Sequence, residues 1–315
     1  MSGEILSDKN RNGQERPWRS KKIANLRYAE YLAVLQFKKA HNVQGCGDVL
    51  QFKKKSDGTI RLYQTWFCHS RLCPLCAWRR TMKNDVNLTK IIRQATQEEK
   101  GRFLFLTLTE KNAYPDELQD KVRHMVRSFN KLIKYKKVAK NLLGYVRSTE
   151  VTYNAEEDTY HHHLHVLLYV KNAYFRNSEN YIPQTEWKKL WQKAMQLDYL
   201  PSVDVKTAKA NAEKRKSSEV ASALEVAKYE VKSSDYMTDK DDQNLKVIDV
   251  LEHALAGTRQ LGYGGIMKKV KQELALEDAE DGDLVNIDGE QESEPDDAEI
   301  IVAKWNNDRK NYFIW

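Results

Sequence analysis

The segment YHHHLHVLLYV at residues 160–170 restricts the fold more than any other stretch, because it combines an apolar run with four histidines. Successive side chains of an extended chain point to opposite faces, so His161, His163 and His165 share one face. His162 points to the other face with the apolar residues. Imidazole is a common neutral metal ligand and a poor filler for a dry core. The segment therefore predicts a strand that carries a metal site on one face.

A second alternating segment, GYVRSTEVTY at residues 144–153, precedes the histidine strand, and the polar turn NAEEDT joins the two. An antiparallel pairing in which Tyr153 opposes Tyr160 also places Glu150 opposite His163. Directly opposed residues share one face of a sheet, with Cβ atoms about 5 Å apart. The pairing therefore predicts a carboxylate beside the imidazoles.

Glu150, His163 and His165 together form a candidate site for a divalent cation. Two imidazoles and one carboxylate leave coordination positions open, which suits a catalytic Mg²⁺ or Mn²⁺ better than a closed structural zinc site. His161 lies nearest to the turn and is given only a supporting role. The alternative interpretation is a polar sheet face whose histidines are satisfied by water and hydrogen bonds.

The segment SALEVAKYEVKSS at residues 222–234 predicts a helix with two distinct faces. One face is apolar, and the other presents Glu225, Lys228, Tyr229 and Lys232. A phenol has a pKa of about 10 and is a poor nucleophile at neutral pH, but nearby cations favour the phenolate and hold a phosphodiester. Tyr229 is therefore a candidate nucleophile, and Tyr236 is the second choice. The alternative is a solvated helix face with a Glu–Lys pair.

The remaining segments alternate between predicted strands and helices. Residues 102–109 (RFLFLTLT) predict a buried strand, and residues 116–138 and 184–196 have the spacing of amphipathic helices. The order of elements is strand–helix–strand–strand–helix–strand–helix. This order predicts an α+β fold in which helices pack against an antiparallel sheet.

Composition divides the chain into six predicted segments. They are a mobile arm (1–20), an N-terminal module with the cysteines (21–98), the α+β domain with the histidines (100–240), a helical extension (241–270), an acidic disordered segment (271–299) and a C-terminal apolar tail (300–315). In the N-terminal module, two alternating runs around Ser-Asp-Gly predict a β-hairpin. The sequence has no apolar run of about 20 residues and no signal-peptide pattern, so we expect a cytoplasmic protein that does not span a membrane.

The net charge of +7 hides a sharp division along the chain. Residues 273–299 hold 13 acidic side chains and no Lys or Arg, while residues 300–315 contribute +2, so residues 1–272 carry +18. A basic body of this kind is typical of proteins that bind phosphate polymers, and the alternative is a soluble surface rich in lysine. Four tryptophans are candidate platforms for unpaired bases: Trp66, Trp78, Trp187 and Trp191.

Four cysteines occur, at Cys46, Cys68, Cys73 and Cys76, and three of them lie within CHSRLCPLC. In a cytosolic chain this spacing favours a metal site over disulfides. Four thiolates suffice for tetrahedral zinc, and the alternatives are free thiols or an iron–sulfur cluster, whose fourth cysteine normally follows the other three. We expect a small zinc module for DNA recognition in which Arg71, Arg79 and Arg80 contact phosphates.

An ordered set of motifs along most of the chain carries a family resemblance. The motifs are RPWRSKKIAN, WFCHSRLCPLCAWRR, FLFLTLT, YHHHLHVLLYV, LEVAKYEVKSSDYM and KNYFI. Taken together, they resemble the rolling-circle replication initiators (Rep proteins) of small plasmids from Gram-positive bacteria, which are members of the HUH endonuclease superfamily. The resemblance implies an enzyme that nicks plasmid DNA at the double-strand origin and transfers the strand.

The resemblance also implies roles for individual residues. His163 and His165 would bind the cation, and Tyr229 would attack a DNA phosphate to leave a 5′-phosphotyrosine and a free 3′-OH. Glu225 matches the glutamate that would activate water for the terminating cleavage. A host helicase and a DNA polymerase are the partners that the family implies. The alternatives are another HUH transesterase, such as a relaxase or transposase, a metal-dependent hydrolase without a covalent step, and a zinc-bearing DNA-binding regulator without enzymatic activity.

Overall fold

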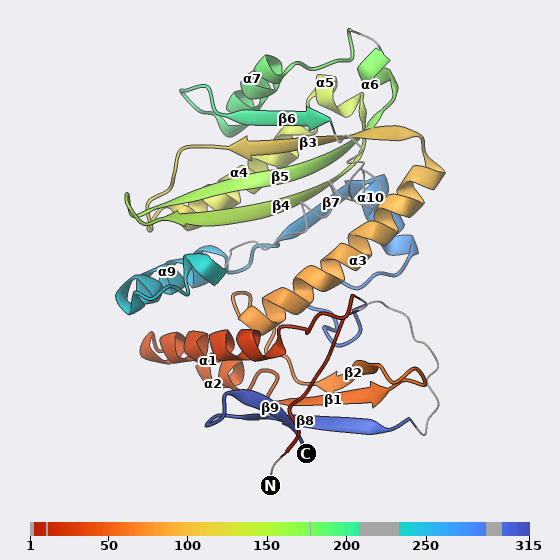
Figure 1. Ribbon diagram of the computed structural model, residues 1–315. Coiled ribbons are helices and arrows are strands. Elements are labelled where there is room, and N and C mark those ends of the chain that lie inside the picture. The colour runs from red at the N-terminus through yellow and green to blue at the C-terminus, as the bar shows by residue number, and fades with distance from the viewer. Residues whose placement is uncertain (1–2, 11, 177, 208–232, 288–297) are drawn as a thin grey trace. The chain divides into compact units, whose positions relative to one another are not determined.

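The computed structural model describes residues 3–10, 12–176, 178–207, 233–287 and 298–315 (Figure 1). The chain forms two compact units. Unit 1 consists of Met1–Lys83, Tyr236–Ile248 and Glu277–Trp315, and unit 2 consists of Asn84–Asp235 and Asp249–Leu276. The chain passes from one unit to the other within helix α3 (Pro74–Glu98), after Asp235, within helix α9 (Asp241–Ala254) and after Leu276.

Unit 2 is built on a five-stranded sheet with the strand order β6–β3–β5–β4–β7 (Figure 1). Its strands are β3 (Gly101–Thr109), β4 (Leu142–Asn154), β5 (Thr159–Lys171), β6 (Val203–Thr207) and β7 (Leu261–Gly265). Every neighbouring pair is antiparallel. The predicted α+β class with an antiparallel sheet is therefore confirmed.

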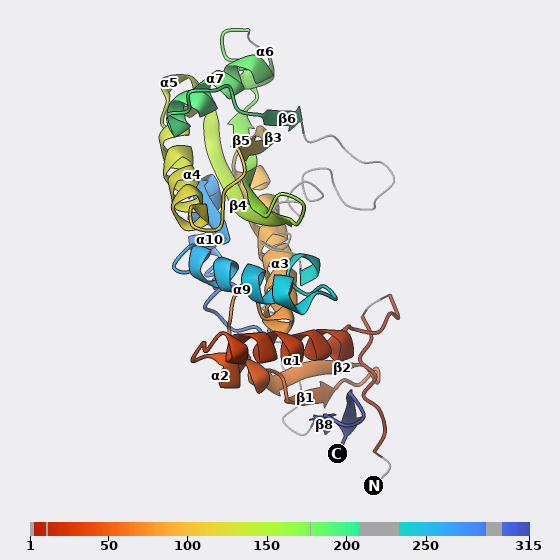
Figure 2. The same cartoon turned by 90° about the vertical axis from the view of Figure 1, so that its left-hand side faces the viewer.

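Both faces of the central strand β5 are buried along most of its length, because helices cover the sheet from two sides (Figure 2). On one side, Leu164, Val166 and Leu168 pack with the apolar stripes of α4 (Leu118–Leu132) and α7 (Gln184–Met195). On the other side, Leu167 and Tyr169 pack with α3 and α10 (Ile266–Glu273). The short helices α5 (Lys136–Ala139) and α6 (Ala173–Arg176) connect these elements.

Unit 1 contains a four-stranded antiparallel sheet in the order β2–β1–β8–β9. Strands β1 (Val49–Lys54) and β2 (Ile60–Thr65) form the predicted hairpin, and β8 (Ile300–Asn306) and β9 (Asn311–Ile314) complete the sheet. Helices α1 (Trp18–Val34) and α2 (Ala40–Gln44) also belong to unit 1, and the one-turn helix η1 (Ser233–Asp235) is the last part of unit 2 before the chain enters unit 1 at Tyr236. The ring of Trp18 meets Phe52 edge-on and so joins α1 to the inner face of the sheet.

The structure differs from the sequence prediction at the two ends of the chain. Residues 1–20 were expected to form a mobile arm, but helix α1 begins at Trp18, whose side chain is buried. Residues 300–315 were expected to form an apolar tail able to fold back onto the body of the chain, and they do so as two strands that were not predicted, β8 and β9, of which β8 pairs directly with β1. Local patterns did not reveal this pairing because its two partners lie some 250 residues apart.

Two further segments differ from the sequence prediction. A third predicted segment lies outside the described residues. Residues 241–270 were predicted to be a helical extension with a glycine-rich end; α9 confirms the helix, but the glycine-rich end is strand β7, which pairs with β4 at the edge of the sheet. Residues 271–299 were predicted to be disordered, but Leu284 is buried and its carbonyl accepts a hydrogen bond from Arg79. The predicted helix at residues 222–234 carries Tyr229; its residues 222–232 lie outside the described residues, and Ser233 and Ser234 belong to η1.

Across the described ranges, none of the helices combines the length and the apolar character that a membrane crossing requires.

The glycine-rich end of β7 gives a prediction about stability. Gly265 has φ +57°, and a Cβ there would lie 2.2 Å from the Leu143 carbonyl oxygen. Gly265→Ala should therefore destabilise the protein by more than about 2 kcal/mol, because backbone strain and a clash with β4 add together. Gly257→Ala is the matched control: Gly257 also has positive φ, but its added Cβ meets nothing within 4 Å. Urea unfolding of both variants makes the comparison, and equal losses would contradict it.

Candidate metal centre

Three predicted metal ligands lie on the paired strands β4 and β5. Glu150 opposes His163 and Ser148 opposes His165, so the predicted register is confirmed. His163 and His165 are on the face of β5 that also carries Leu167 and Tyr169. Helices α3 and α10 cover the latter two residues, and the histidines continue the same face toward the β4–β5 turn.

The ligand atoms of the three residues converge on one point. Nε2 of His165 lies 2.9 Å from Oε2 of Glu150, and Nε2 of His163 lies 3.4 Å from the same oxygen. The two Nε2 atoms are 3.1 Å apart. Side chains from two strands thus direct two nitrogens and a carboxylate oxygen toward one another, as ligands of a common cation do.

The carboxylate of Glu150 is held in its ionised form. Burial by itself raises the pKa of this carboxyl, but hydrogen bonds from His163 and His165 and their charges outweigh burial and hold the pKa well below its usual range. An ionised carboxylate and neutral imidazoles are the forms that bind a divalent cation.

Residues around the three ligands set their orientation. Oγ1 of Thr107, on the neighbouring strand β3, lies 3.3 Å from Nδ1 of His165, and the Phe105 ring packs beside the same imidazole. These contacts fix the ring with Nε2 toward Glu150, as outer contacts do in metal sites. Nδ1 of His163 is buried without a hydrogen-bond partner. The donor set of two imidazole nitrogens and one carboxylate oxygen is one that can hold a metal ion.

His161 and His162 have different surroundings from the three converging ligands. The ring of His161 stacks on His163, but its Nδ1 lies 3.1 Å from the Asn112 side-chain oxygen. Burial and the charges of His163 and His162 lower the pKa of His161. His162 is fully buried on the other face, 2.6 Å from a carboxylate oxygen of Glu110. Thr107, Asn112 and Glu110 were not predicted as site residues from the sequence.

The predicted nucleophile and its neighbours lie outside the described residues. This applies to Glu225, Lys228, Tyr229 and Lys232. The second choice, Tyr236, is described: its side chain is buried, and its hydroxyl donates a hydrogen bond of 2.7 Å to the Leu72 carbonyl. Tyr236 therefore has a structural partner within unit 1.

Two arginines that were predicted to contact phosphates have internal partners instead. Arg79 is buried and donates to the carbonyls of Leu284 and Val285, and Arg80 is buried and donates to the carbonyls of Arg71 and His69. This is a correction to the predicted role of Arg79 and Arg80. The half-buried Arg71 lies 3.8 Å from a carboxylate oxygen of Glu280.

The four candidate tryptophans also differ in exposure. Trp187 and Trp191 belong to the core beneath the sheet of unit 2, and Trp78 is buried in unit 1. Trp66 is 52% exposed and is the candidate whose ring is accessible.

The four cysteines gather in unit 1, and their sulfur atoms all lie within 4.8 Å of one another. All four are free thiols rather than disulfides. Burial raises the pKa of the Cys73 thiol, but hydrogen bonds with the other three thiols outweigh burial and place that pKa well below its usual range. The sequence prediction that these residues form one cluster is confirmed.

Comparison with known proteins gives a consistent result. A family model described as "Replication protein" matches residues 59–313. "Protein rep" of Lactiplantibacillus plantarum is 58% identical over 99% of both chains. "Protein rep" of Lentilactobacillus hilgardii is 52% identical over the whole of both chains, and "Protein rep" of Streptococcus pneumoniae serotype 2 is 41% identical over 99% of this chain and 96% of the relative. No solved structure matches this chain.

The fold and the site define an α+β protein with two imidazoles and a carboxylate gathered on an antiparallel sheet. The chain belongs to the replication-protein (Rep) family. The resemblance to plasmid replication initiators is thereby confirmed.

The contact between Thr107 and His165 gives a prediction about metal affinity. Thr107→Val should weaken Mn²⁺ binding by about 10–100-fold, because the imidazole loses the partner that orients it. His165→Ala should remove measurable binding. Thr96→Val is the control, because the Thr96 hydroxyl donates to the carbonyls of Ile92 and Arg93 in its own helix, α3. Electron paramagnetic resonance of free Mn²⁺ during a titration measures each affinity, and a His165→Ala variant that binds like wild type would contradict the assignment.

Proposed function

We propose that this protein initiates rolling-circle replication by nicking plasmid DNA at the double-strand origin. The observation that carries the proposal is the convergence of His163, His165 and Glu150 on one sheet in a member of the replication-protein family. The proposal makes the protein a cytoplasmic DNA-nicking endonuclease and strand transferase of the HUH type.

The first part of the proposal concerns the cation. His163, His165 and Glu150 would hold Mg²⁺ or Mn²⁺, with His161 supporting His163 by stacking. When bound, such a cation polarises a phosphate oxygen and stabilises the charge that develops during displacement. Three protein ligands would leave coordination positions of the cation open, and a DNA phosphate oxygen would occupy one of them.

The second part concerns the covalent step, which we assign to Tyr229 from the family motif. The phenolic oxygen of Tyr229 forms a bond to phosphorus as the bond from phosphorus to the 3′-oxygen breaks. The phenolic proton passes to solvent, and the released 3′-oxygen takes up a proton. Lys228 and Lys232 favour the phenolate and hold the phosphodiester. The products are a 5′-phosphotyrosine and a free 3′-OH.

The third part concerns what precedes and follows the nick. Glu225 activates water for the terminating cleavage after one round of replication. The substrate is plasmid origin DNA, of which the nicked stretch must be single-stranded or extruded. A host DNA polymerase extends the 3′-OH while a host helicase unwinds the duplex ahead of it, in keeping with the family.

The nucleophile gives a direct test of the proposal. Tyr229→Phe should lose nicking of a supercoiled origin plasmid in the presence of Mn²⁺ while still binding the DNA, because only the attacking oxygen is removed. Tyr236→Phe is the matched control and should nick, since Tyr236 bonds the Leu72 carbonyl in unit 1. Mass spectrometry of peptides after reaction with an origin oligonucleotide should find a nucleotide adduct on residue 229.

The same experiment separates the alternatives. A non-enzymatic regulator would leave the plasmid intact, and a hydrolase without a covalent step would leave Tyr229→Phe active. A transposase or relaxase would cut transposon ends or a transfer origin in preference to the replication origin. Any of these outcomes overturns the proposal.

A further inference from the structure

The cysteine cluster of unit 1 has the dimensions of a tetrahedral zinc site. The sulfur of Cys46 lies 3.6 Å from that of Cys76 and 3.8 Å from that of Cys73, and Cys68 lies 3.7 Å from Cys76. A tetrahedron with zinc–sulfur bonds of about 2.3 Å has edges of about 3.8 Å. Disulfide-bonded sulfurs are only about 2.05 Å apart. The spacing therefore matches four ligands around one ion.

Hydrogen-bond donors point at the sulfurs from outside the cluster. The side-chain amide of Asn25 donates to Sγ of Cys73 at 3.3 Å, and the backbone N–H of Cys68 donates to Sγ of Cys46 at 3.4 Å. Four thiolates around one Zn²⁺ ion have a net charge of about −2. Hydrogen-bond donors directed at the sulfurs stabilise this negative charge.

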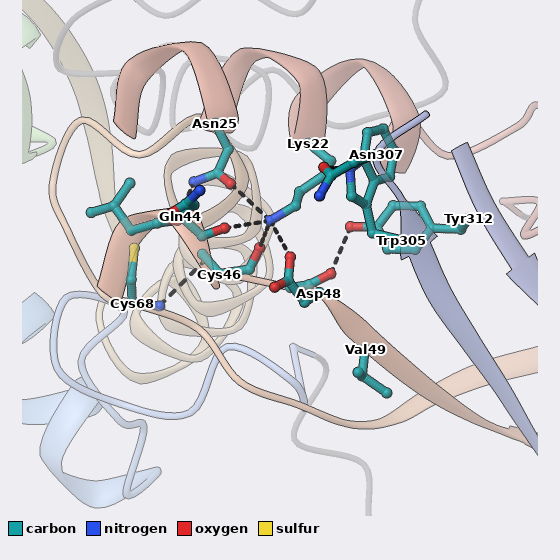
Figure 3. Close-up of polar contacts among 12 residues, drawn as sticks. Lys22, Asn25, Gln44, Cys46, Asp48, Val49, Cys68, Trp305, Asn307 and Tyr312 are labelled. Atoms are coloured by element: carbon teal, nitrogen blue, oxygen red, sulfur yellow. Dashed lines mark hydrogen bonds and ion pairs between the residues drawn. The ribbon is translucent and has the colours of Figure 1, made fainter. Parts of the chain in front are cut away.

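A fully buried lysine holds the loop that carries Cys46 (Figure 3). The Lys22 ammonium donates to the Gln44 carbonyl at 2.7 Å and to the Cys46 carbonyl at 2.8 Å. It also bonds the Asn25 side-chain oxygen and pairs with the Asp48 carboxylate at 2.6 Å. A buried ammonium is costly unless it is fully paired, and all its partners here lie on helix α1 or on the Cys46 loop.

We infer that Cys46, Cys68, Cys73 and Cys76 bind one structural zinc ion, and that Lys22 and Asn25 are positioning residues for this site. Lys22 fixes the backbone on both sides of Cys46, and Asn25 both bonds Cys73 and donates to the Val43 carbonyl. The two residues lie one helical turn apart on α1, so one helix face organises the site. The zinc site is independent of the nicking activity proposed for unit 2.

Metal analysis of the purified full-length chain tests the inference. We expect one zinc per chain and four thiols that react with a thiol reagent only after the zinc is removed. Lys22→Met should weaken zinc binding by about 10–100-fold in competition with a chelator, and Lys38→Met, at an exposed lysine of unit 1, should not. Four reactive thiols without metal in the wild type, or iron with acid-labile sulfide, would overturn the inference.

A second and independent observation concerns the outer face of the sheet in unit 1. Leu50, Phe52 and Leu62 are buried on the inner face toward α1, so Lys53 and Arg61, which oppose each other, point outward. On the other half of the sheet, Lys304 opposes Phe313. The outer face also carries Tyr63, which is 47% exposed, and Trp315, which is 79% exposed.

Each aromatic ring on this face is paired with a cation. The Lys53 ammonium lies 4.6 Å from the centre of the Tyr63 ring, and that of Lys304 lies 4.0 Å from the centre of the Trp315 ring. The Arg309 guanidinium lies 5.2 Å from the centre of the Phe313 ring. Among acidic groups near this sheet, Glu299 pairs with Lys54 at the end of β1. Accessible rings interleaved with Lys and Arg favour unpaired bases and their phosphates.

We propose that this outer face, defined by Lys53, Tyr63, Lys304, Phe313 and Trp315, binds single-stranded DNA. Bases would stack on the rings while the cations contact phosphates. This proposal rests on the proposed function, because it takes DNA as the substrate. It identifies a surface for the unpaired strand that is separate from the metal ligands.

Fluorescence anisotropy with an oligothymidine of 20 nucleotides tests this surface. Tyr63→Ala and Trp315→Ala should each weaken binding about tenfold, with recovery in Tyr63→Phe and Trp315→Phe, because any aromatic ring offers a stacking face. A variant with both Lys53→Ala and Lys304→Ala should bind with a weaker salt dependence. The slope of the logarithm of the binding constant against the logarithm of salt concentration should fall in magnitude by about 1.4, or about 0.7 for each phosphate contact. Tyr181→Ala, at a 49% exposed tyrosine of unit 2, is the control.

The outcomes separate this surface from the nicking activity. Weaker oligothymidine binding in the variants supports the surface even if the wild type fails to nick, in which case only the proposed function is lost. If the wild type nicks DNA and the Tyr63→Ala and Trp315→Ala variants bind oligothymidine as tightly as it does, the proposed binding surface is wrong. A loss of binding to duplex DNA alone would also overturn the proposed surface.

Discussion

The antiparallel register between β4 and β5 is the constraint on which the candidate site depends. Because Glu150 opposes His163, the carboxylate and the imidazoles share one face and meet within hydrogen-bond distance. A slip of one residue would turn Glu150 to the other face and dismantle the site. The register is stabilised by the burial of both faces of β5, since α4 and α7 cover one face and α3 and α10 cover the other.

This arrangement explains why a polar cluster can exist at the edge of a core. Leu167 and Tyr169 fill the covered part of the same face, and the histidines begin where the helical cover ends. The packed part of the face, at Leu167 and Tyr169, makes the strand rigid. The side chains of Glu150, His163 and His165 are 10–17% exposed. Thr107 extends the support to β3, so three adjacent strands hold the ligands in place.

The sequence predicted this part of the molecule well because its information is local. The β4–β5 hairpin joins Glu150 and His163 through a short turn, and alternation determines the face of each side chain. The four cysteines were also predicted as a cluster, since three of them are close in sequence. By contrast, Thr107 on β3 and Asn112 in the loop that follows β3 were missed, because a local pattern does not show that this segment lies beside β5.

Unit 1 shows where local patterns were insufficient. Its sheet combines β1 and β2 with β8 and β9 from the other end of the chain, and a segment predicted to be disordered contributes the buried Leu284. That packing occupies the guanidinium of Arg79, a residue whose basic character alone suggested contact with DNA. Charge and motif indicate what a residue is able to bind, but its partner depends on which distant segment packs beside it.

The central claim is that the two imidazoles and the carboxylate of unit 2 hold a divalent cation. Anomalous diffraction from crystals of the full-length protein grown with Mn²⁺ tests it most directly. We expect a manganese peak bonded to Nε2 of His163, Nε2 of His165 and the carboxylate of Glu150. A manganese-soaked crystal with no peak between these three residues would contradict it.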